Sequence, residues 1–152
     1  MKFIIIVLVL ASLLLAFKIY EQKNPNIKFD NSMLKIIKQN GEVIELNIKV
    51  ADSPAERERG LMFVKQMPED EGMLFIFDSE EMRRMWMKNT LIPLDMLFVG
   101  GNKEILNVKE NATPESLDIV FSVAPTKYVV ELNGGFIAKH KIKIGDKIEF
   151  MQ

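Results

Sequence analysis

The sequence has no cysteine and a single histidine, His140, among its 152 residues. The absence of cysteine excludes disulfides, thiol catalysis, iron–sulfur clusters and cysteine-based zinc sites, and a single imidazole excludes a site built on two. An excess of one charge sign is also missing, since 20 Lys and Arg stand against 21 Asp and Glu. A near-neutral chain lacks the electrostatic footprint of a general nucleic-acid binder. The length suffices for one domain and leaves no room for a second sizeable core.

Motifs of nucleophilic and phosphate chemistry are missing as well. The sequence contains no Gly-x-Ser-x-Gly elbow and no glycine-rich loop with the spacing of a phosphate or dinucleotide site. A Ser–His–acid set would have to use His140, which stands between Lys139 and Lys141 and is therefore predicted to be exposed. We predict no resident cofactor, and the remaining candidates for a site are tryptophan, lysine, asparagine and carboxylates.

Hydrophobicity is concentrated at the N-terminus. Residues 3–17 contain one polar side chain, Ser12, and are bounded by Lys2 and Lys18. A charged start followed by a short apolar run is typical of a secretory signal, whereas a membrane span needs about 20 apolar residues. Beyond Lys18, Ile19 and Tyr20 extend the run almost to that length, and no small-x-small cleavage site follows. We therefore favour an uncleaved membrane-anchor helix over residues 1–20 rather than a cleaved signal, with the domain outside the cytoplasm.

A polar segment separates this hydrophobic helix from the rest of the chain. Residues 21–32 are broken by Pro25 and carry no periodic pattern, which is typical of a linker. Residues 33–152 then form a single β-rich domain. Without residues 1–20 the chain keeps 18 basic residues against 21 acidic ones, a net charge of −3. Such a domain does not attract nucleic acid or anionic lipid, so the expected partners are the membrane, through the N-terminal segment, and a small molecule or glycan.

Short strands separated by turn residues dominate the domain. Residues 44–50 alternate apolar and polar side chains after Asn40-Gly41, the pattern of a hairpin with one buried face. Ser53-Pro54-Ala55-Glu56 is a capping box and predicts a helix from Pro54 to about Met62. The pattern further predicts strands at 33–38, 73–77, 84–88, 94–99, 104–108, 128–132 and 147–150, a second short helix at 136–140, an exposed polar stretch at 78–83 and little pattern at 111–122. The fold class is therefore mainly β, a compact sandwich or barrel with one or two short helices.

Two acidic residues stand among apolar neighbours. Asp95 lies between Leu94 and Met96, and a carboxylate buried there needs donors or a cation nearby. Glu131 shares its face of a strand with Val129 by alternation, which is unusual for a solvated glutamate. Each acid could act in acid–base catalysis, and each could instead be a structural carboxyl that binds backbone amides.

The chain's single tryptophan lies in Trp86-Met87-Lys88-Asn89-Thr90. A flat apolar ring beside several donors suits a polar ligand with an apolar face, such as a sugar. A strand-to-turn segment in which asparagine and threonine satisfy backbone groups would explain the same residues. In the ligand hypothesis the ring stacks, the lysine and asparagine donate, and two carboxylates orient them or accept from the ligand. The candidate ligand-binding residues are then Trp86, Lys88, Asn89, Asp95 and Glu131.

Methionine is unevenly distributed along the chain. Seven of the ten methionines fall between Met62 and Met96. Met82, Met85 and Met87 surround the tryptophan, and their thioethers are soft ligands that suit Cu(I). Alternation, however, directs Met85 and Met87 to one side of a strand and the tryptophan to the other, and flexible core packing explains these residues without a metal.

Several blocks of the sequence resemble a known family. They are Arg57-x-x-Gly60-Leu61-Met62, Gly72-Met73-Leu74-Phe75, Trp86-Met87-Lys88-Asn89-Thr90 with Ile92-Pro93-Leu94-Asp95, Val130-Glu131-Leu132-Asn133-x-Gly135 and Ile144-Gly145-Asp146. In these residues the chain is similar to the family called domain of unknown function 192, over about residues 44–150. The resemblance implies a compact β fold of the sandwich or jelly-roll kind, in small bacterial and archaeal domains that often follow a signal or anchor. It brings no activity, cofactor or substrate, and Arg84-Met85 departs from the aromatic that commonly precedes the tryptophan.

We therefore predict a membrane-anchored or exported β domain that binds a small polar ligand or glycan. One alternative is an envelope-associated hydrolase that uses Asp95 or Glu131 as its acid or base. The other is a Cu(I)-binding protein that uses Met82, Met85 and Met87. The ligand hypothesis further requires that the residues assigned to the site converge on one cleft.

Overall fold

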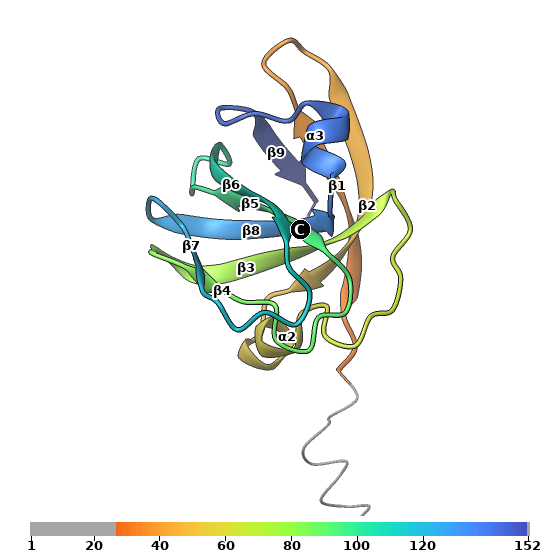
Figure 1. Cartoon of the computed structure of the whole chain (residues 1–152). Coiled ribbons are helices and arrows are strands. Elements are labelled where there is room, and N and C mark those ends of the chain that lie inside the picture. The colour runs from red at the N-terminus through yellow and green to blue at the C-terminus, as the bar shows by residue number, and fades with distance from the viewer. Residues whose placement is uncertain (1–26, 152) are drawn as a thin grey trace, which may run out of the picture.

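The computed structural model describes residues 27–151, which form one curled sheet of seven strands, a separate two-stranded ribbon and two short helices (Figure 1). The strands are β1 (Asp30–Ile37), β2 (Val43–Ala51), β3 (Glu71–Glu81), β4 (Arg84–Met85), β5 (Leu94–Val99), β6 (Ile105–Ala112), β7 (Val120–Phe121), β8 (Thr126–Asn133) and β9 (Lys147–Phe150). The helices are α2 (Pro54–Arg59) and α3 (Phe136–His140). The sheet has the order β6-β5-β8-β3-β2-β1-β9, and β4 pairs with β7. The predicted mainly β class with short helices is confirmed.

The seven-stranded sheet nearly closes on itself. β6 and β9 stand at opposite ends of the strand order, yet Glu104 and Lys147 form a β-bridge between them. The backbone N–H of Ile105 donates to the carbonyl of Asp146 at 2.8 Å across the same seam. The curled sheet is therefore a partial barrel with an enclosed interior.

One pair of neighbouring strands, β2 and β3, runs parallel, and the other pairs among the described strands are antiparallel. A parallel pair needs a crossover connection, which α2 and the loop to Asp70 supply. The β1–β2 hairpin turns at Asn40-Gly41 as predicted, and the Gly41 N–H donates to the Lys38 carbonyl at 2.9 Å.

Local signals set the start and the end of α2. The Ser53 hydroxyl accepts the Glu56 N–H at 3.3 Å, and the Glu56 carboxylate accepts the Ser53 N–H at 2.9 Å, so the predicted capping box is formed. The helix ends at Arg59 rather than near Met62, because Gly60 adopts a φ of 46°. A side chain at position 60 would also meet the Phe75 ring at 3.2 Å, so glycine allows this turn to pack on β3.

The boundaries of several strands differ from the sequence prediction where the pairing partner is distant in the sequence. The exposed polar residues after Phe77 remain in β3, because Glu81 pairs with Thr126 of β8. β4 contains only Arg84 and Met85, so Trp86 follows the strand instead of lying inside it. The stretch at 111–122 with little sequence pattern contains β7, whose partner β4 is distant in the chain.

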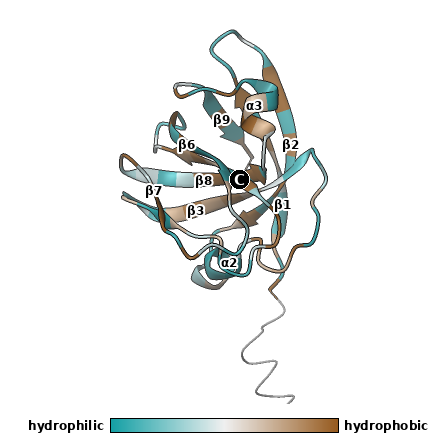
Figure 2. Ribbon diagram, viewed as in Figure 1, coloured by the Kyte–Doolittle hydropathy of each residue, from teal (hydrophilic) through white to brown (hydrophobic). Residues whose placement is uncertain are grey.

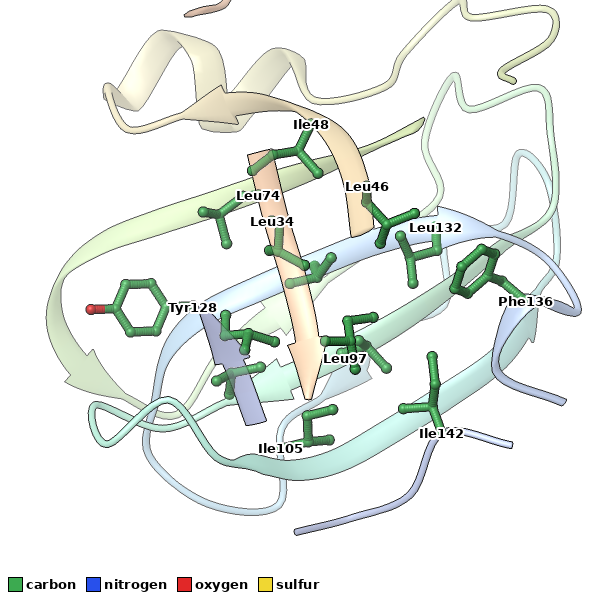
Figure 3. Packing of buried hydrophobic residues seen from close by; sticks show 14 of the residues in the cluster. Leu34, Leu46, Ile48, Leu74, Leu97, Ile105, Tyr128, Leu132, Phe136 and Ile142 are labelled. Atoms are coloured by element: carbon green, nitrogen blue, oxygen red, sulfur yellow. The ribbon is translucent and has the colours of Figure 1, made fainter. Parts of the chain in front are cut away.

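The two faces of the sheet carry different cores. The interior of the curl is filled by aliphatic and aromatic side chains (Figure 3), and this interior core includes Leu34, Ile36, Leu46, Ile48, Leu74, Leu97, Val130 and Leu132. The other face of β3, β5 and β8 carries the methionine core, which consists of Ala51, Leu61, Met73, Phe75, Met87, Leu94, Met96, Phe98, Ala112 and Val129. Figure 2 shows that β3 is hydrophobic along much of its length, whereas α2, which buries no residue, is hydrophilic.

Within residues 27–151, none of the helices combines the length and the apolar character needed to cross a membrane. The hydrophobic helix predicted over residues 1–20 lies outside the described part of the chain, as does most of the linker predicted over 21–32.

Candidate functional site

Asp95 is fully buried in β5, on the side of the interior core. One carboxylate oxygen accepts the N–H of Asn111 at 2.8 Å and that of Gly135 at 3.1 Å. The other oxygen accepts the N–H of Ile137 at 2.8 Å. The carboxylate therefore joins β6, the turn after β8 and the start of α3, which corresponds to the structural alternative stated for it.

Glu131 lies in β8 on the side of the methionine core. The register pairs it with Met73 of β3 and with Met96 of β5. Its side chain is 4% exposed, and burial alone raises the pKa of the carboxyl to about 8. No hydrogen bond or cation from residues 27–151 offsets this burial, so the group carries a proton near neutral pH.

The two acids do not share a site. Asp95 pairs across the ladder with Leu132 of the interior core, whereas the next pair joins Met96 and Glu131. Successive residues of a strand point to opposite faces, so the sheet itself lies between the two carboxyl groups. An acid–base pair made of these two residues is excluded by this geometry.

Residues 86–90 form a turn against the methionine core. Met87 is buried, and its carbonyl accepts the Thr90 N–H at 3.0 Å. Asn89 has a φ of 53°, and its side-chain amide donates to the sulfur of Met62 at 3.9 Å. The Asn89 carbonyl also accepts the Phe63 N–H at 2.9 Å. Asn89 therefore connects two loops, and the turn-forming alternative accounts for it.

The ribbon of β4 and β7 covers part of the methionine core. Met85 pairs with Val120, and both pack against that core from the inward face of the ribbon. Arg84 pairs with Phe121 on the outward face, and the Ser122 N–H extends the pairing by donating to the Arg83 carbonyl at 3.0 Å. The exposed side chains on and beside this outward surface define the ribbon face, namely Met82, Arg84, Trp86, Lys88, Leu117, Ile119, Phe121 and Val123.

Large apolar side chains dominate the ribbon face. Trp86 is 41% exposed, Met82 54% and Phe121 59%. An antiparallel pair that covers a core with one face normally presents polar side chains on the other. A run of exposed apolar side chains marks a surface for a ligand or a partner, and this one lies around the predicted Trp86.

Two cations accompany these apolar side chains. The ammonium nitrogen of Lys88 lies 4.9 Å from the centroid of the Trp86 ring, within cation–π distance. Neither Arg84 nor Lys88 forms an ion pair with any residue between 27 and 151. The ribbon face thus brings Trp86 and Lys88 together, as the ligand hypothesis requires, but not Asn89, Asp95 or Glu131.

The three methionines of the copper hypothesis do not share one environment. Met82 is exposed, whereas Met87 is buried in the methionine core and Met85 packs against it. Met85 and Met87 lie on the side opposite Trp86, as the alternation predicts. The set is thereby divided between the two sides of the ribbon.

His140 is half-buried, and the prediction of an exposed histidine is wrong. Its ring stacks on that of Phe136 with centroids 4.1 Å apart, and its Nε2 lies 3.9 Å from a carboxylate oxygen of Glu69. The stacking partner stands four residues earlier in α3, on the same face of the helix, which the basic flanking residues did not reveal.

Sequence reasoning missed the contribution of residues 117–123. Their outward members are Leu117, Ile119, Phe121 and Val123, which recur with a period of two. That alternation is a strand signal, but the apolar side chains face solvent instead of the core. Arg84 was not predicted as a site residue either, since only its pairing with Phe121 places it on the ribbon face.

Comparison with known proteins finds a family and solved structures of the same fold. The model of the DUF192 family, described as "Uncharacterized ACR", matches residues 35–150 and confirms the resemblance. A candidate transcription regulator from Sinorhizobium meliloti 1021 is 38% identical with a TM-score of 0.80, over 82% of this chain and 97% of that one. A protein of unknown function from Novosphingobium aromaticivorans DSM 12444 is 34% identical with a TM-score of 0.78, over 83% of this chain and 89% of that one. We find no match among curated proteins.

Proposed function

Since the chain belongs to the uncharacterised DUF192 family, its function has to be argued from its own surface, and we propose that it is a binding domain. Its ligand is a polar molecule with an apolar face, of the glycan class, and the ribbon face receives it. The observation that carries the proposal is the exposure of Trp86 and Phe121 near Arg84 and Lys88, two cations that form no ion pair within residues 27–151.

The chemistry of these side chains gives each a role. Trp86, which follows β4, and Phe121, which pairs with Arg84, offer flat apolar surfaces on which the C–H face of a sugar ring stacks. Lys88 donates to ligand oxygens as a compact charge, and Arg84 offers a planar fork that matches a carboxylate. A glycan that carries carboxylates uses both kinds of contact, so an acidic glycan is the class we favour.

Charge favours a discrete ligand over a lipid surface for this face. Arg84 interrupts the apolar row between Met82 and Trp86, where insertion into a bilayer would have to bury its charge.

The proposal includes a membrane-anchored or exported location outside the cytoplasm. It rests on the apolar run at residues 3–17. Phe29, near the start of the described chain, packs against the methionine core, which the inward face of the ribbon also covers. An anchor that precedes Phe29 would keep the ribbon face close to envelope material at the membrane.

Trp86 is the only tryptophan, so its fluorescence reports directly on the ribbon face. We expect a saturable fluorescence change when the full chain, in detergent micelles, is titrated with oligosaccharides that contain uronic acids. Phe121→Ala keeps the fluorophore and should weaken binding by roughly tenfold, the loss of one stacked ring. Phe63→Ala is the matched control, because Phe63 is an exposed aromatic outside the ribbon face.

The glycan proposal fails if no member of the panel gives a saturable change. It also fails if Phe121→Ala and Phe63→Ala have equal affinities. Binding to glycan-free phosphatidylcholine vesicles that Phe121→Ala reduces would instead assign the ribbon face to lipid contact. Because micelles could mask such binding, the vesicle measurement uses the chain reconstituted through its N-terminal segment.

A further inference from the structure

A row of three buried side chains crosses three neighbouring strands on one face of the sheet. Glu131 of β8 is paired with Met73 of β3 on one side and with Met96 of β5 on the other. Directly paired residues have Cβ atoms about 4.5–5.5 Å apart and point to the same face. Both methionines are fully buried and the glutamate is almost so. Two methionine residues therefore flank one glutamate on the same buried face of the sheet.

The buried methionines of residues 27–151 all lie on this side of the sheet. The methionine core contains Met73, Met87 and Met96, and Met67 and Met85 pack against it. The interior core on the opposite face, as far as residues 27–151 describe it, contains no methionine and is filled by leucine, isoleucine, valine and aromatic side chains.

Within residues 27–151, Glu131 differs from the other buried carboxyl groups in accepting no hydrogen bond. Asp95 accepts three backbone N–H groups, and Asp146 accepts those of Gln39 at 3.0 Å and Lys143 at 2.8 Å. Glu131 is 4% exposed, and no hydrogen bond within residues 27–151 occupies its carboxylate oxygens, so they are free to bind a cation.

We propose that Met73, Glu131 and Met96 form a binding site for one soft monovalent cation of the Cu(I) class. Thioether sulfurs are uncharged, soft donors that select Cu(I) over harder ions. The single carboxylate balances the single positive charge.

The donor set excludes the hard divalent cations. Ca²⁺ takes six to eight oxygen ligands and Mg²⁺ demands six in an octahedron. Within residues 27–151 no group of three His, Cys, Asp or Glu side chains is placed to hold a metal ion. This site also differs from the set of Met82, Met85 and Met87, which the ribbon divides between its two sides.

The test uses Ag(I), a redox-stable probe of Cu(I) sites, titrated into the full chain in micelles in chloride-free buffer, with heat as the readout. Cu(I) itself is then measured under ascorbate against a chromogenic chelator. The site variants are Glu131→Gln and the double variant Met73→Leu with Met96→Leu, which conserves side-chain volume. The matched control is Met33→Leu with Met82→Leu, since it removes two thioethers that are exposed.

We expect one cation per chain, with affinity reduced by roughly ten- to a hundredfold or more in both site variants and unchanged in the control. Methyl-labelled methionine resonances of the unsubstituted chain provide a readout that does not depend on any variant folding. Ag(I) should shift the Met73 and Met96 signals at one equivalent. The proposal is overturned if neither cation binds at micromolar concentration, if the control loses as much affinity as the site variants, or if only exposed methionines shift.

Discussion

Asp95 of β5 and Glu131 of β8 belong to successive pairs of one β-ladder, yet their side chains lie on opposite faces of the sheet. Asp95 is held by three backbone N–H groups, whereas no hydrogen bond from residues 27–151 reaches the Glu131 carboxyl. Two acids with similar apolar neighbours in the sequence therefore have different physical roles. The first joins segments of the chain, and the second remains available to a ligand.

Replacing Asp95 with asparagine should destabilise the fold strongly. The amide has one acceptor oxygen, and its NH₂ group would face an N–H donor, so at least one of the three buried bonds is lost. We expect the free energy of unfolding to fall by about 2–4 kcal/mol, measured by urea denaturation. Asp118→Asn, at an exposed position, should change it by less than about 0.5 kcal/mol. A small effect of Asp95→Asn would contradict the structural role.

The stability of the protein should fall with rising pH because of Glu131. The pKa of this carboxyl is about 8 in the folded state against an ordinary 4.5. Between these values the folded chain holds a proton that the unfolded chain has lost. The stability present below about pH 4.5 therefore declines as pH rises towards about 8, by at most about 1.4 kcal/mol per pH unit.

Glu131→Gln should remove this component, because glutamine does not titrate. Denaturation series from about pH 5 to about pH 8 would show a flatter profile for the variant than for the unsubstituted chain. Glu110→Gln, an exposed acid in β6, serves as the control and should retain the decline. Parallel profiles for the unsubstituted chain and Glu131→Gln would show that the carboxyl is ionised in the folded state.

Asp146 should be required for closure of the curled sheet. Its carboxylate accepts the N–H groups of Gln39 and Lys143, and its backbone carbonyl accepts that of Ile105 in β6. Asp146→Ala leaves two donors unpaired beside this seam, and we expect a loss of about 2–4 kcal/mol. Hydrogen exchange should rise first at the amides of Ile105 and Ile148, which bond across the seam. Uniform exchange along the chain would argue against a local opening.

The N-terminal apolar run should decide how the protein partitions. The full chain is expected in the detergent-rich phase of a phase-separation assay, and a variant lacking residues 1–20 in the aqueous phase. The mass of the protein isolated from a bacterial envelope distinguishes an uncleaved anchor from a processed signal. Recovery of a chain shortened by about 20 residues would reject the uncleaved anchor.

The sequence by itself determined the features whose causes lie within a few residues. The turn at Asn40-Gly41, the capping box at Ser53 and the short helix over 136–140 depend on local dihedral preferences and local hydrogen bonds, so they could be predicted. The family resemblance and the burial of Asp95 could also be predicted from the sequence, since both depend on residue identities at fixed spacing.

Only the tertiary structure decided which distant residues meet. The parallel pairing of β2 with β3, the pairing of Arg84 with Phe121 in the ribbon, and the row of Met73, Glu131 and Met96 all depend on register between segments far apart in the chain. A shift of one residue in any such pairing would reverse the faces. Alternation along a single strand predicts which side chains share a face. Whether that face packs in a core, contacts solvent or binds a ligand depends on the strands that pack beside it.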